Sequence, residues 1–492
     1  MKILLIYPES PSTFYSFRNA LKFISKKSAE PPLGLITVAA MLPEKWEKKL
    51  IDMNVSKLKD KYLDWADYVF ISGMNIHKSS FKTIVKRCNQ FGVKVVAGGP
   101  MVTADYNEFQ GVDHFVLNEA EVTLPRFLKD LENDCPKHIY ASTDFPDIIT
   151  TPVPLWNLLD IKKYATIGIQ YSRGCPYNCE FCSITMLNGR RPRTKSKEQF
   201  IRELDSLYQI GWRGDVFVVD DNFIGNRRKL KSDLLPALIE YSKKRKYPFS
   251  YTAEVSINLA DDDELANLMI KAGFNSIFVG IESPNDDSLA ECGKSQNRKR
   301  DLIDSVKKLQ RFGFMVGAGF IVGFDNDPPN IFKRQINFIQ KSGIATAMVG
   351  ILNAPEGTRL FHRLKSENRL LNTATGDNMD GTINFIPKMN YHKLMNGYKE
   401  VLNTIYAPKA YYERVRMFLK EFHPSDKYLK KISIKDIKAL VKSFWLLGIL
   451  EKGRVYFWRL FFLGLFKHPQ KFSVVITLAI YGFHFRQIIK TV

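Results

Sequence analysis

Three cysteines lie within one short run, RGCPYNCEFCSI, at Cys175, Cys179 and Cys182. Thiolates are soft ligands that suit iron–sulfur clusters or zinc. A structural zinc site needs four ligands, but the next cysteine downstream is Cys292 and the next histidine is His362. The spacing therefore favours a metal centre with three protein ligands and one open coordination position. The alternatives are a zinc knuckle completed by a distant residue and cysteines without a metal role.

The cysteine run follows directly on an apolar segment that is typical of a buried strand. Between residues 161 and 370, six such segments alternate with amphipathic helical patterns. Their ranges are 167–172, 215–221, 249–255, 276–282, 316–324 and 346–352. Six strand–helix units predict a partial (β/α)6 barrel of the TIM type, with the cysteines in the loop after its first strand.

Acidic residues end two of the predicted barrel strands. Glu254 ends the third strand, and Glu282 followed by Ser283 ends the fourth. Because side chains at the C-terminal mouth of a barrel usually contact the ligand, these three residues are candidates for cofactor binding. A strand-end cap is the alternative role. The sequence identifies no catalytic residue.

Residues 1–140 show another alternation of strands and helices. Strand-like segments occupy 2–7, 49–53, 68–74, 93–100 and 114–121, with helical stretches between them. This pattern predicts a Rossmann-like, doubly wound parallel sheet. Gly73, Gly98 and Gly99 lie at the strand ends, where such sheets bind ligands, although glycine in a turn is commonly only conformational. Residues 141–160 carry three prolines and no clear period, so we expect an ordered linker there.

The cysteine run resembles the signature of radical S-adenosylmethionine enzymes. The resemblance implies that Cys175, Cys179 and Cys182 hold three irons of a [4Fe-4S] cluster, whose fourth iron binds S-adenosylmethionine. It also implies that Phe181, just before the last cysteine, packs beside the adenine. The loop after the first barrel strand is where the family places this motif.

The later barrel strands carry further matches to the same family. By this resemblance, Asp220, Asp221 and Asn222 after the second strand are candidates to meet the methionyl amine, with a helix cap and turn as the alternative. Gly323, together with Gly319 and Phe324, resembles the glycine pattern of the fifth strand beside the adenine.

The two alternating regions together are more specific than either one. PPLGLITVAAMLP (31–43), VVAGGPMVT (95–103) and LNEAE (117–121), followed by the cysteine loop, resemble cobalamin-binding radical S-adenosylmethionine proteins. The chain is most similar to the branch that contains hopanoid C-2 methylase. The resemblance implies that an adenosyl radical removes a substrate hydrogen and that methylcobalamin supplies the methyl group. It also implies an external electron donor such as flavodoxin or ferredoxin.

One departure from that pattern concerns the cobalt ligand. Classical cobalamin domains carry Asp-x-His-x-x-Gly, whose histidine binds cobalt. Here Asp52 is present, but Asn54 stands in place of the histidine. Many members of the subfamily also lack that histidine and bind cobalamin without it. His77 ends a predicted strand and can face the corrin, but we expect it to face solvent in a loop.

The last part of the chain, residues 371–492, changes to helical patterns. Residues 401–492 hold 17 Lys and Arg against 5 Asp and Glu, within a chain of net charge +21. An uncharged apolar run spans 472–485, too short to cross a bilayer. An interfacial helix beside anionic lipid and a helical cap on the barrel are the two interpretations. Nucleic-acid binding is not expected, because the aromatic residues gather in apolar blocks.

Composition limits the compartment and the remaining alternatives. Six cysteines in 492 residues exclude a disulfide scaffold, and the N-terminal apolar run is too short for a signal peptide. We expect a cytoplasmic protein, peripheral on the inner face of the membrane if the tail binds lipid. A radical cyclase or rearrangement enzyme without methyl transfer is one alternative function. A zinc-dependent nucleic-acid-binding protein is the other.

Overall fold

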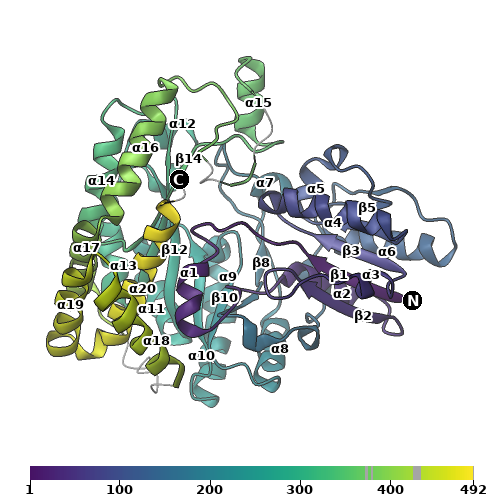
Figure 1. Ribbon diagram of the computed structural model, residues 1–492, viewed down its shortest axis with the longest axis horizontal. Coiled ribbons are helices and arrows are strands. Elements are labelled where there is room, and N and C mark those ends of the chain that lie inside the picture. The colour runs from purple at the N-terminus through teal and green to yellow at the C-terminus, as the bar shows by residue number, and fades with distance from the viewer. Residues whose placement is uncertain (372–374, 378–380, 425–433, 491–492) are drawn as a thin grey trace.

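The computed structural model describes residues 1–371, 375–377, 381–424 and 434–490 (Figure 1). Its N-terminal sheet lies on the right of Figure 1, the barrel lies in the centre, and the C-terminal helices lie on the left. Both sheets are fully parallel, as the alternation of strands and helices predicts.

The first sheet contains six strands in the order β2-β1-β3-β4-β5-β6. They are β1 (Lys2–Tyr7), β2 (Glu47–Asp52), β3 (Tyr68–Ser72), β4 (Lys94–Gly98), β5 (His114–Val116) and β6 (Ile139–Tyr140). Helices α2 (Leu33–Met41) and α6 (Ala120–Glu132) cover one face. Helices α4 (Lys78–Gln90) and α5 (Pro100–Ala104) cover the other. The sheet is therefore doubly wound, as predicted, and only the two-residue edge strand β6 was not foreseen.

The second sheet follows the chain without reversal, in the order β14-β13-β12-β11-β10-β7. Its strands are β7 (Ile167–Ile169), β10 (Asp215–Val218), β11 (Ser250–Val255), β12 (Phe274–Glu282), β13 (Met315–Val322) and β14 (Thr346–Ile351). The connecting helices are α8 (Lys197–Gln209), α10 (Leu235–Lys244), α11 (Asp263–Ala272), α13 (Leu302–Phe312) and α14 (Ile331–Ser342). The partial barrel of six strand–helix units is confirmed.

Short elements decorate the mouth of the barrel. They are the hairpin of β8 (Ser172–Arg173) and β9 (Arg193–Thr194), and the helices α7 (Ile184–Leu187), α9 (Arg227–Lys229), α12 (Asp286–Glu291) and α15 (Arg359–Ser366). Residues 141–160 are ordered against α8. The Trp156 indole N–H donates to the Ser206 hydroxyl at 2.9 Å, and the Gln199 amide donates to the Thr151 carbonyl at 2.7 Å.

The C-terminal region is a helical layer on the barrel. It comprises α16 (Tyr391–Tyr406), α17 (Pro408–Glu421), α18 (Ile434–Trp445), η12 (Leu446–Leu450), α19 (Arg454–Phe462), η13 (Leu463–Lys467) and α20 (Phe472–Ile489). By length and composition, one helix in the described residues, Pro469–Ile489, can cross a membrane, and half of its most apolar stretch is buried. Leu478 and Phe485 of α20 are fully buried in the barrel core. This placement corresponds to the packing interpretation of the apolar run.

The segment between β1 and α2, residues 8–32, leaves the first sheet and crosses to the C-terminal layer. It contains α1 (Arg18–Leu21) and the turn η1 (Lys22–Ile24), and α1 packs on α20. The Phe17 ring lies 5.0 Å from that of Tyr481, and the buried His484 ring bonds to the Phe14 carbonyl at 3.1 Å. The start and the end of the chain therefore form one packed layer.

Candidate active site

The cysteine loop is closed at its base by the β8–β9 hairpin. Gly174, which precedes the first cysteine, has φ +95°, and a Cβ there would lie 2.8 Å from the Arg191 carbonyl oxygen. Only glycine fits such a turn. The Cys175 N–H donates to the Gly189 carbonyl at 3.2 Å, which joins the two ends of the loop. The backbone therefore fixes where the first thiol starts.

The three thiols lie within electrostatic reach of one another. Cys179 is buried, whereas Cys175 and Cys182 are partly buried. Burial is the main cause of the raised pKa at each thiol, and the pKa of Cys182 rises to about 12. Cys179 raises the pKa of Cys175 and of Cys182 further. Because metal ligation needs thiolates, binding a metal here releases protons.

The arrangement of the thiols discriminates between the two metal interpretations. Among the residues that the structure describes, no three His, Cys, Asp or Glu side chains converge closely enough to hold one metal ion. A structural zinc site needs four ligands, whereas this loop supplies three thiols. Three soft donors on one partly buried loop fit an iron–sulfur cluster, which is larger and keeps its fourth iron open.

Two aspartates after β10 brace the cysteine loop. Asp220 is 1% exposed and accepts hydrogen bonds from the Tyr171 N–H at 2.7 Å and the Ser172 hydroxyl at 2.5 Å. Burial raises its pKa to about 7. Asp221 accepts from the Gly174 N–H at 2.8 Å. Both side chains thus position the hairpin, and a contact with S-adenosylmethionine stays a prediction for each.

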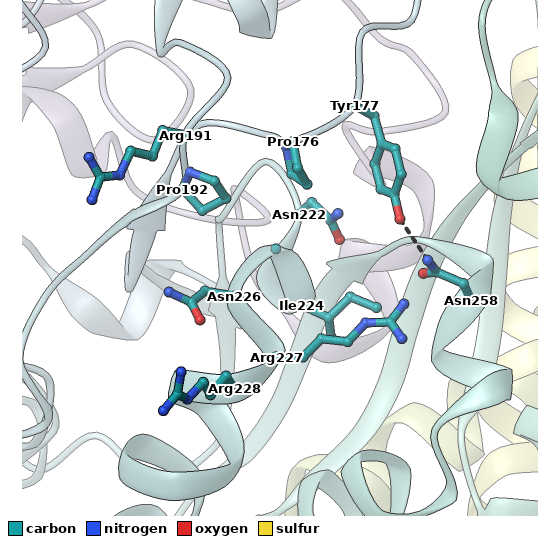
Figure 2. Close-up of a pocket in the computed structure, with 11 residues that line it drawn as sticks. Pro176, Tyr177, Arg191, Pro192, Asn222, Ile224, Asn226, Arg227, Arg228 and Asn258 are labelled. Carbon is teal, nitrogen blue, oxygen red and sulfur yellow. Dashed lines mark hydrogen bonds between the residues drawn. The ribbon is translucent and has the colours of Figure 1, made fainter.

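Asn222, the next residue in the loop after β10, braces the end of β11 in a similar way. Its side-chain oxygen accepts a hydrogen bond from the Ser256 N–H at 3.1 Å, at the end of β11. Asn222 also lines an open pocket beside Tyr177 (Figure 2). The turn-and-cap alternative therefore describes the observed bonds, and ligand contact remains a prediction.

The carboxylates at the ends of β11 and β12 have different surroundings. Glu282 has φ +63° and forms a 2.7 Å ion pair with Lys294. The buried Ser283 hydroxyl accepts from the Asn285 N–H at 3.2 Å, which is a cap. Glu254 is exposed to solvent at the end of β11, where the surrounding protein, and then Asp221 and other acids, raise its pKa to about 7. A non-glycine residue at positive φ is strained, and such strain is concentrated at functional sites.

The predicted adenine neighbours lie near one another. The rings of Phe181 and Phe324 are 6.3 Å apart. Gly323 has φ +106°, and its N–H donates to Asp327 at 2.8 Å. At Gly319 on β13, a Cβ would lie 3.5 Å from the Phe278 ring. The structure therefore brings the cysteine loop and the end of β13 together, as the predicted adenine pocket requires.

Sequence reasoning missed two side chains that enter the barrel from the N-terminal segment. Glu30 reaches β7, where a Cβ on Gly168 would lie 3.4 Å from its carboxylate. Burial raises the pKa of Glu30 to about 7. Tyr15 lies at the mouth of the barrel, 54% exposed, with its ring 6.5 Å from that of Phe278. The only sequence feature that pointed to Glu30 is its position just before Pro31. The fold is needed to show that this segment crosses to the barrel.

The predicted glycines occupy crowded positions at the edge of the first sheet. A Cβ on Gly98 would lie 2.9 Å from the Val116 carbonyl oxygen, and one on Gly73 would lie 3.2 Å from His77. Gly99 has φ +92°, and a Cβ there would overlap the Ser72 hydroxyl. These positions admit only glycine, so backbone forms this edge. A flat ligand such as a corrin can approach such an edge closely.

The positions around the expected cobalt ligand are all engaged. The Asn54 amide donates to the Asp52 carboxylate at 2.9 Å and to the Pro8 carbonyl at 3.2 Å. His77 is fully buried, not solvent-facing as the sequence led us to expect. Its Nδ1 accepts from the Met74 N–H at 3.0 Å, and its Nε2 bonds to the Ser10 hydroxyl at 2.8 Å. The 8–32 segment covers His77, and a local sequence window cannot show that cover.

Buried ion pairs join the two sheets directly behind the cysteine loop. Glu119 of the LNEAE run accepts from Arg173 at 2.7 Å and from Arg193 at 2.5 Å. Glu121 pairs with Arg173 at 2.9 Å. These four side chains are at most 15% exposed. The acidic residues of the first region and the arginines of the hairpin therefore set the position of the cysteines relative to the first sheet.

A doubly wound sheet with a glycine edge, facing a partial barrel with a three-thiol loop, defines a radical enzyme with several cofactors. Family models support both halves. A B12 binding domain matches residues 24–128, and the radical SAM superfamily matches residues 169–339. A domain of unknown function, DUF4070, matches residues 358–492.

Relatives extend the match over the whole chain. An uncharacterized methyltransferase of Synechocystis is 42% identical, covering 99% of this chain and 92% of the relative. Hopanoid C-2 methylase of Rhodopseudomonas palustris is 33% identical, covering 93% and 88%. This chain therefore belongs to the cobalamin-binding radical S-adenosylmethionine methyltransferase family. It is an enzyme whose cofactors are a [4Fe-4S] cluster, S-adenosylmethionine and cobalamin.

Solved structures share the fold at low sequence identity. OxsB, a cobalamin-dependent S-adenosylmethionine radical enzyme, superposes with a TM-score of 0.63 at 15% identity, covering 100% of this chain and 80% of OxsB. TsrM, a radical S-adenosylmethionine methyltransferase of Kitasatospora setae, gives 0.62 at 12% identity, covering 100% and 99%. These likenesses concern the fold alone.

Proposed function

We propose that this enzyme methylates an unactivated carbon of a polycyclic lipid at a membrane surface. The observation that carries the proposal is the 33% identity to hopanoid C-2 methylase, which extends over 93% of this chain. When bound, the cluster with S-adenosylmethionine supplies a hydrogen-abstracting radical, and cobalamin supplies the methyl group. An external one-electron donor such as flavodoxin or ferredoxin completes the proposal.

The chain's own residues have three tasks in this reaction. Cys175, Cys179 and Cys182 hold the cluster on a loop that Asp221 braces. The glycine edge of the first sheet, around Gly98, receives cobalamin. The 8–32 segment brings Glu30 against Gly168 of β7, beside the mouth of the barrel where the substrate would bind.

Membrane contact is supported by exposed side chains of the C-terminal layer. We define the apolar rim as the exposed residues of α18, η12, α19 and η13. Its members are Val441, Trp445, Ile449, Leu450, Val455, Phe462, Leu465 and Phe466, between 40% and 73% exposed. The rings of Phe462 and Phe466 stack at 6.0 Å, so they form one continuous surface. Large exposed apolar patches on soluble domains mark interaction sites.

Cations surround this apolar rim. Lys452, Arg454, Arg459 and Lys467 are exposed within the same helices. The nearby acid Glu451 is engaged by Arg486 at 2.6 Å. Apolar insertion combined with positive charge is the combination that binds anionic lipid surfaces. The rim is thus a better membrane candidate than the buried helix α20.

Reconstituted enzyme tests the proposal. The holoenzyme is incubated with S-adenosylmethionine, a reductant and vesicles that contain a pentacyclic triterpenoid, and products are identified by mass spectrometry. We expect a product heavier by one methyl group, together with 5′-deoxyadenosine. Accumulation of 5′-deoxyadenosine with an unmethylated, rearranged product would instead support the cyclase alternative.

A variant tests the membrane part separately. Phe466→Asp combined with Trp445→Asp places charge in the apolar rim, and we expect loss of co-sedimentation with anionic vesicles. Phe91 at the end of α4 is an exposed aromatic residue outside the rim, and Phe91→Asp is the control for binding. Equal sedimentation of all three proteins would contradict membrane contact through the rim.

A further inference from the structure

A basic surface lies beside the cysteine loop. Arg191, Arg227 and Arg228 line an open pocket of about 570 Å³, together with residues of the loops after β7 and β10. Arg190 immediately precedes Arg191 in the chain and is exposed. In Figure 2, Asn226 lies between Arg191 and Arg228, and the Arg227 side chain extends on the opposite side toward Asn258.

Most of these arginines lack the partners that arginines elsewhere in this protein have. Within the described residues, the side chains of Arg190, Arg191 and Arg228 form no ion pair or hydrogen bond. Arg227 has only a long-range electrostatic interaction, with Asp262. It helps to lower the pKa of Asp262, and its effect is smaller than those of burial, the Leu265 N–H and Lys231. By contrast, Arg193 of the same RRPR run is buried against Glu119. The run thus divides into a structural arginine and outward-facing ones.

The pocket wall includes the cysteine loop itself. Pro176 and Tyr177 directly follow Cys175, and both line the pocket. A Cβ on Gly225 would lie 2.9 Å from Pro192 and 3.6 Å from Pro176, so three loops meet here without intervening layers. The Asn258 amide donates to the Tyr177 hydroxyl at 2.6 Å and closes the pocket (Figure 2). An occupant of this surface therefore lies against the loop that holds the first thiol.

We propose that this basic surface docks a small acidic electron-transfer protein, which reduces the cluster through the Cys175 end of its loop. The inference rests on the proposed function, because only a redox cluster at the cysteines requires such a partner. Unpaired arginines steer an acidic partner and then bond its carboxylates, and arginine is enriched at interfaces. The exposed Pro176 supplies an apolar contact at the centre.

The transfer itself is a one-electron step. When the partner is a flavodoxin, its anionic flavin hydroquinone loses one electron and becomes the neutral semiquinone. The cluster gains that electron, and its charge falls by one. No bond forms or breaks between the two proteins, so the docking surface needs only to hold them together. Charge complementarity is therefore a sufficient design for this surface.

The experiment compares two reductants on the holoenzyme. The test variant is Arg191→Glu with Arg228→Glu, and the matched control is Arg416→Glu with Lys420→Glu on α17, two exposed cations that receive the same charge reversal. The readout is 5′-deoxyadenosine formation, driven either by purified flavodoxin hydroquinone or by dithionite. Flavodoxin titrations at low and high salt give the apparent KM for the partner, and calorimetric titration of the same proteins with oxidised flavodoxin gives a Kd that does not depend on turnover.

We expect the test variant to raise the apparent KM for flavodoxin by about tenfold or more at low salt. The control variant should leave that KM unchanged, and dithionite should drive wild type and test variant equally. Unchanged flavodoxin kinetics in the test variant would overturn the docking proposal, and so would equal losses with both reductants. A test variant that loses binding to a single-stranded RNA probe but keeps wild-type flavodoxin kinetics would also overturn it. The surface would then be a nucleic-acid site. Wild-type enzyme that forms no 5′-deoxyadenosine with dithionite would overturn the proposed function instead.

Discussion

The two parallel sheets of this enzyme each have six strands, yet the C-terminal edge of one is formed by backbone and that of the other by charged side chains. The first sheet reverses its strand order at β1 and offers glycine backbone, with Asp52 bonded to Asn54 and His77 bonded to Ser10. The second sheet never reverses, and its edge carries Asp221, Glu254 and Glu282. A large preformed cofactor needs close approach, whereas a cluster and a small charged ligand need side chains. The residues at each sheet edge therefore suit the ligand that binds there, although both sheets are built from parallel strands.

Removal of a thiol should have the largest effect, and it should affect only the second sheet. Cys179→Ala should abolish bound iron and 5′-deoxyadenosine formation, because the cluster loses one of its three thiolate ligands. Cobalamin binding at the first sheet should persist. Iron analysis and the visible spectrum of the cobalamin-loaded protein measure both. Simultaneous loss of iron and cobalamin would show that the two edges are not independent.

The bridge between the sheets is the next target. Glu119→Gln leaves Arg173 and Arg193 short of their buried acceptor, and breaking a buried ion pair costs about 3–5 kcal/mol. We expect a lower unfolding midpoint and two separated unfolding transitions in denaturant. Glu132→Gln on the exposed surface of α6 is the matched control. A single transition at the wild-type midpoint would mean that other contacts hold the sheets together.

A smaller effect is expected at the glycine edge. Gly99→Ala forces a side chain into left-handed backbone against Ser72, a strain of about 1–3 kcal/mol. We expect weaker cobalamin binding with iron content unchanged. The cysteine variant should show the reverse, with iron lost and cobalamin binding kept. Gly34→Ala, where a Cβ meets nothing within 4 Å, is the control. Cobalamin affinity that stays at the wild-type value would remove the backbone edge from the site.

The smallest predicted effect concerns a proton in the barrel. Burial raises the pKa of Glu30 to about 7, above the ordinary carboxyl value of 4.5. The unfolded chain ionises this group more easily, so its contribution to stability is complete below about pH 4.5 and is lost as the pH rises through 7. Glu30→Gln should therefore reduce the loss of apo-protein stability between pH 5 and pH 8. Urea midpoints at both pH values measure it, and an unchanged slope would place the Glu30 pKa near normal.

Much of this architecture is written in local patterns. The strand segments are apolar runs bounded by turns, so both sheets, their order of appearance and the cysteine loop are predictable from short windows. The β8–β9 hairpin has only two residues per strand and no such pattern. The Glu119 ion pairs, the burial of His77 and the arrival of Glu30 in the barrel depend on contacts between distant segments. Such contacts are set by the fold and not by any local period.

The crossing of residues 8–32 to α20 has a consequence for how the enzyme is made. The ribosome releases the first sheet early, and its strands can pair at once. The crossing segment cannot complete its packing at that stage, because its partner helix α20 follows the whole barrel in the chain. The contact between α1 and α20 therefore forms only after every barrel strand has been synthesised. Closure of this layer is a late step in the folding of the chain.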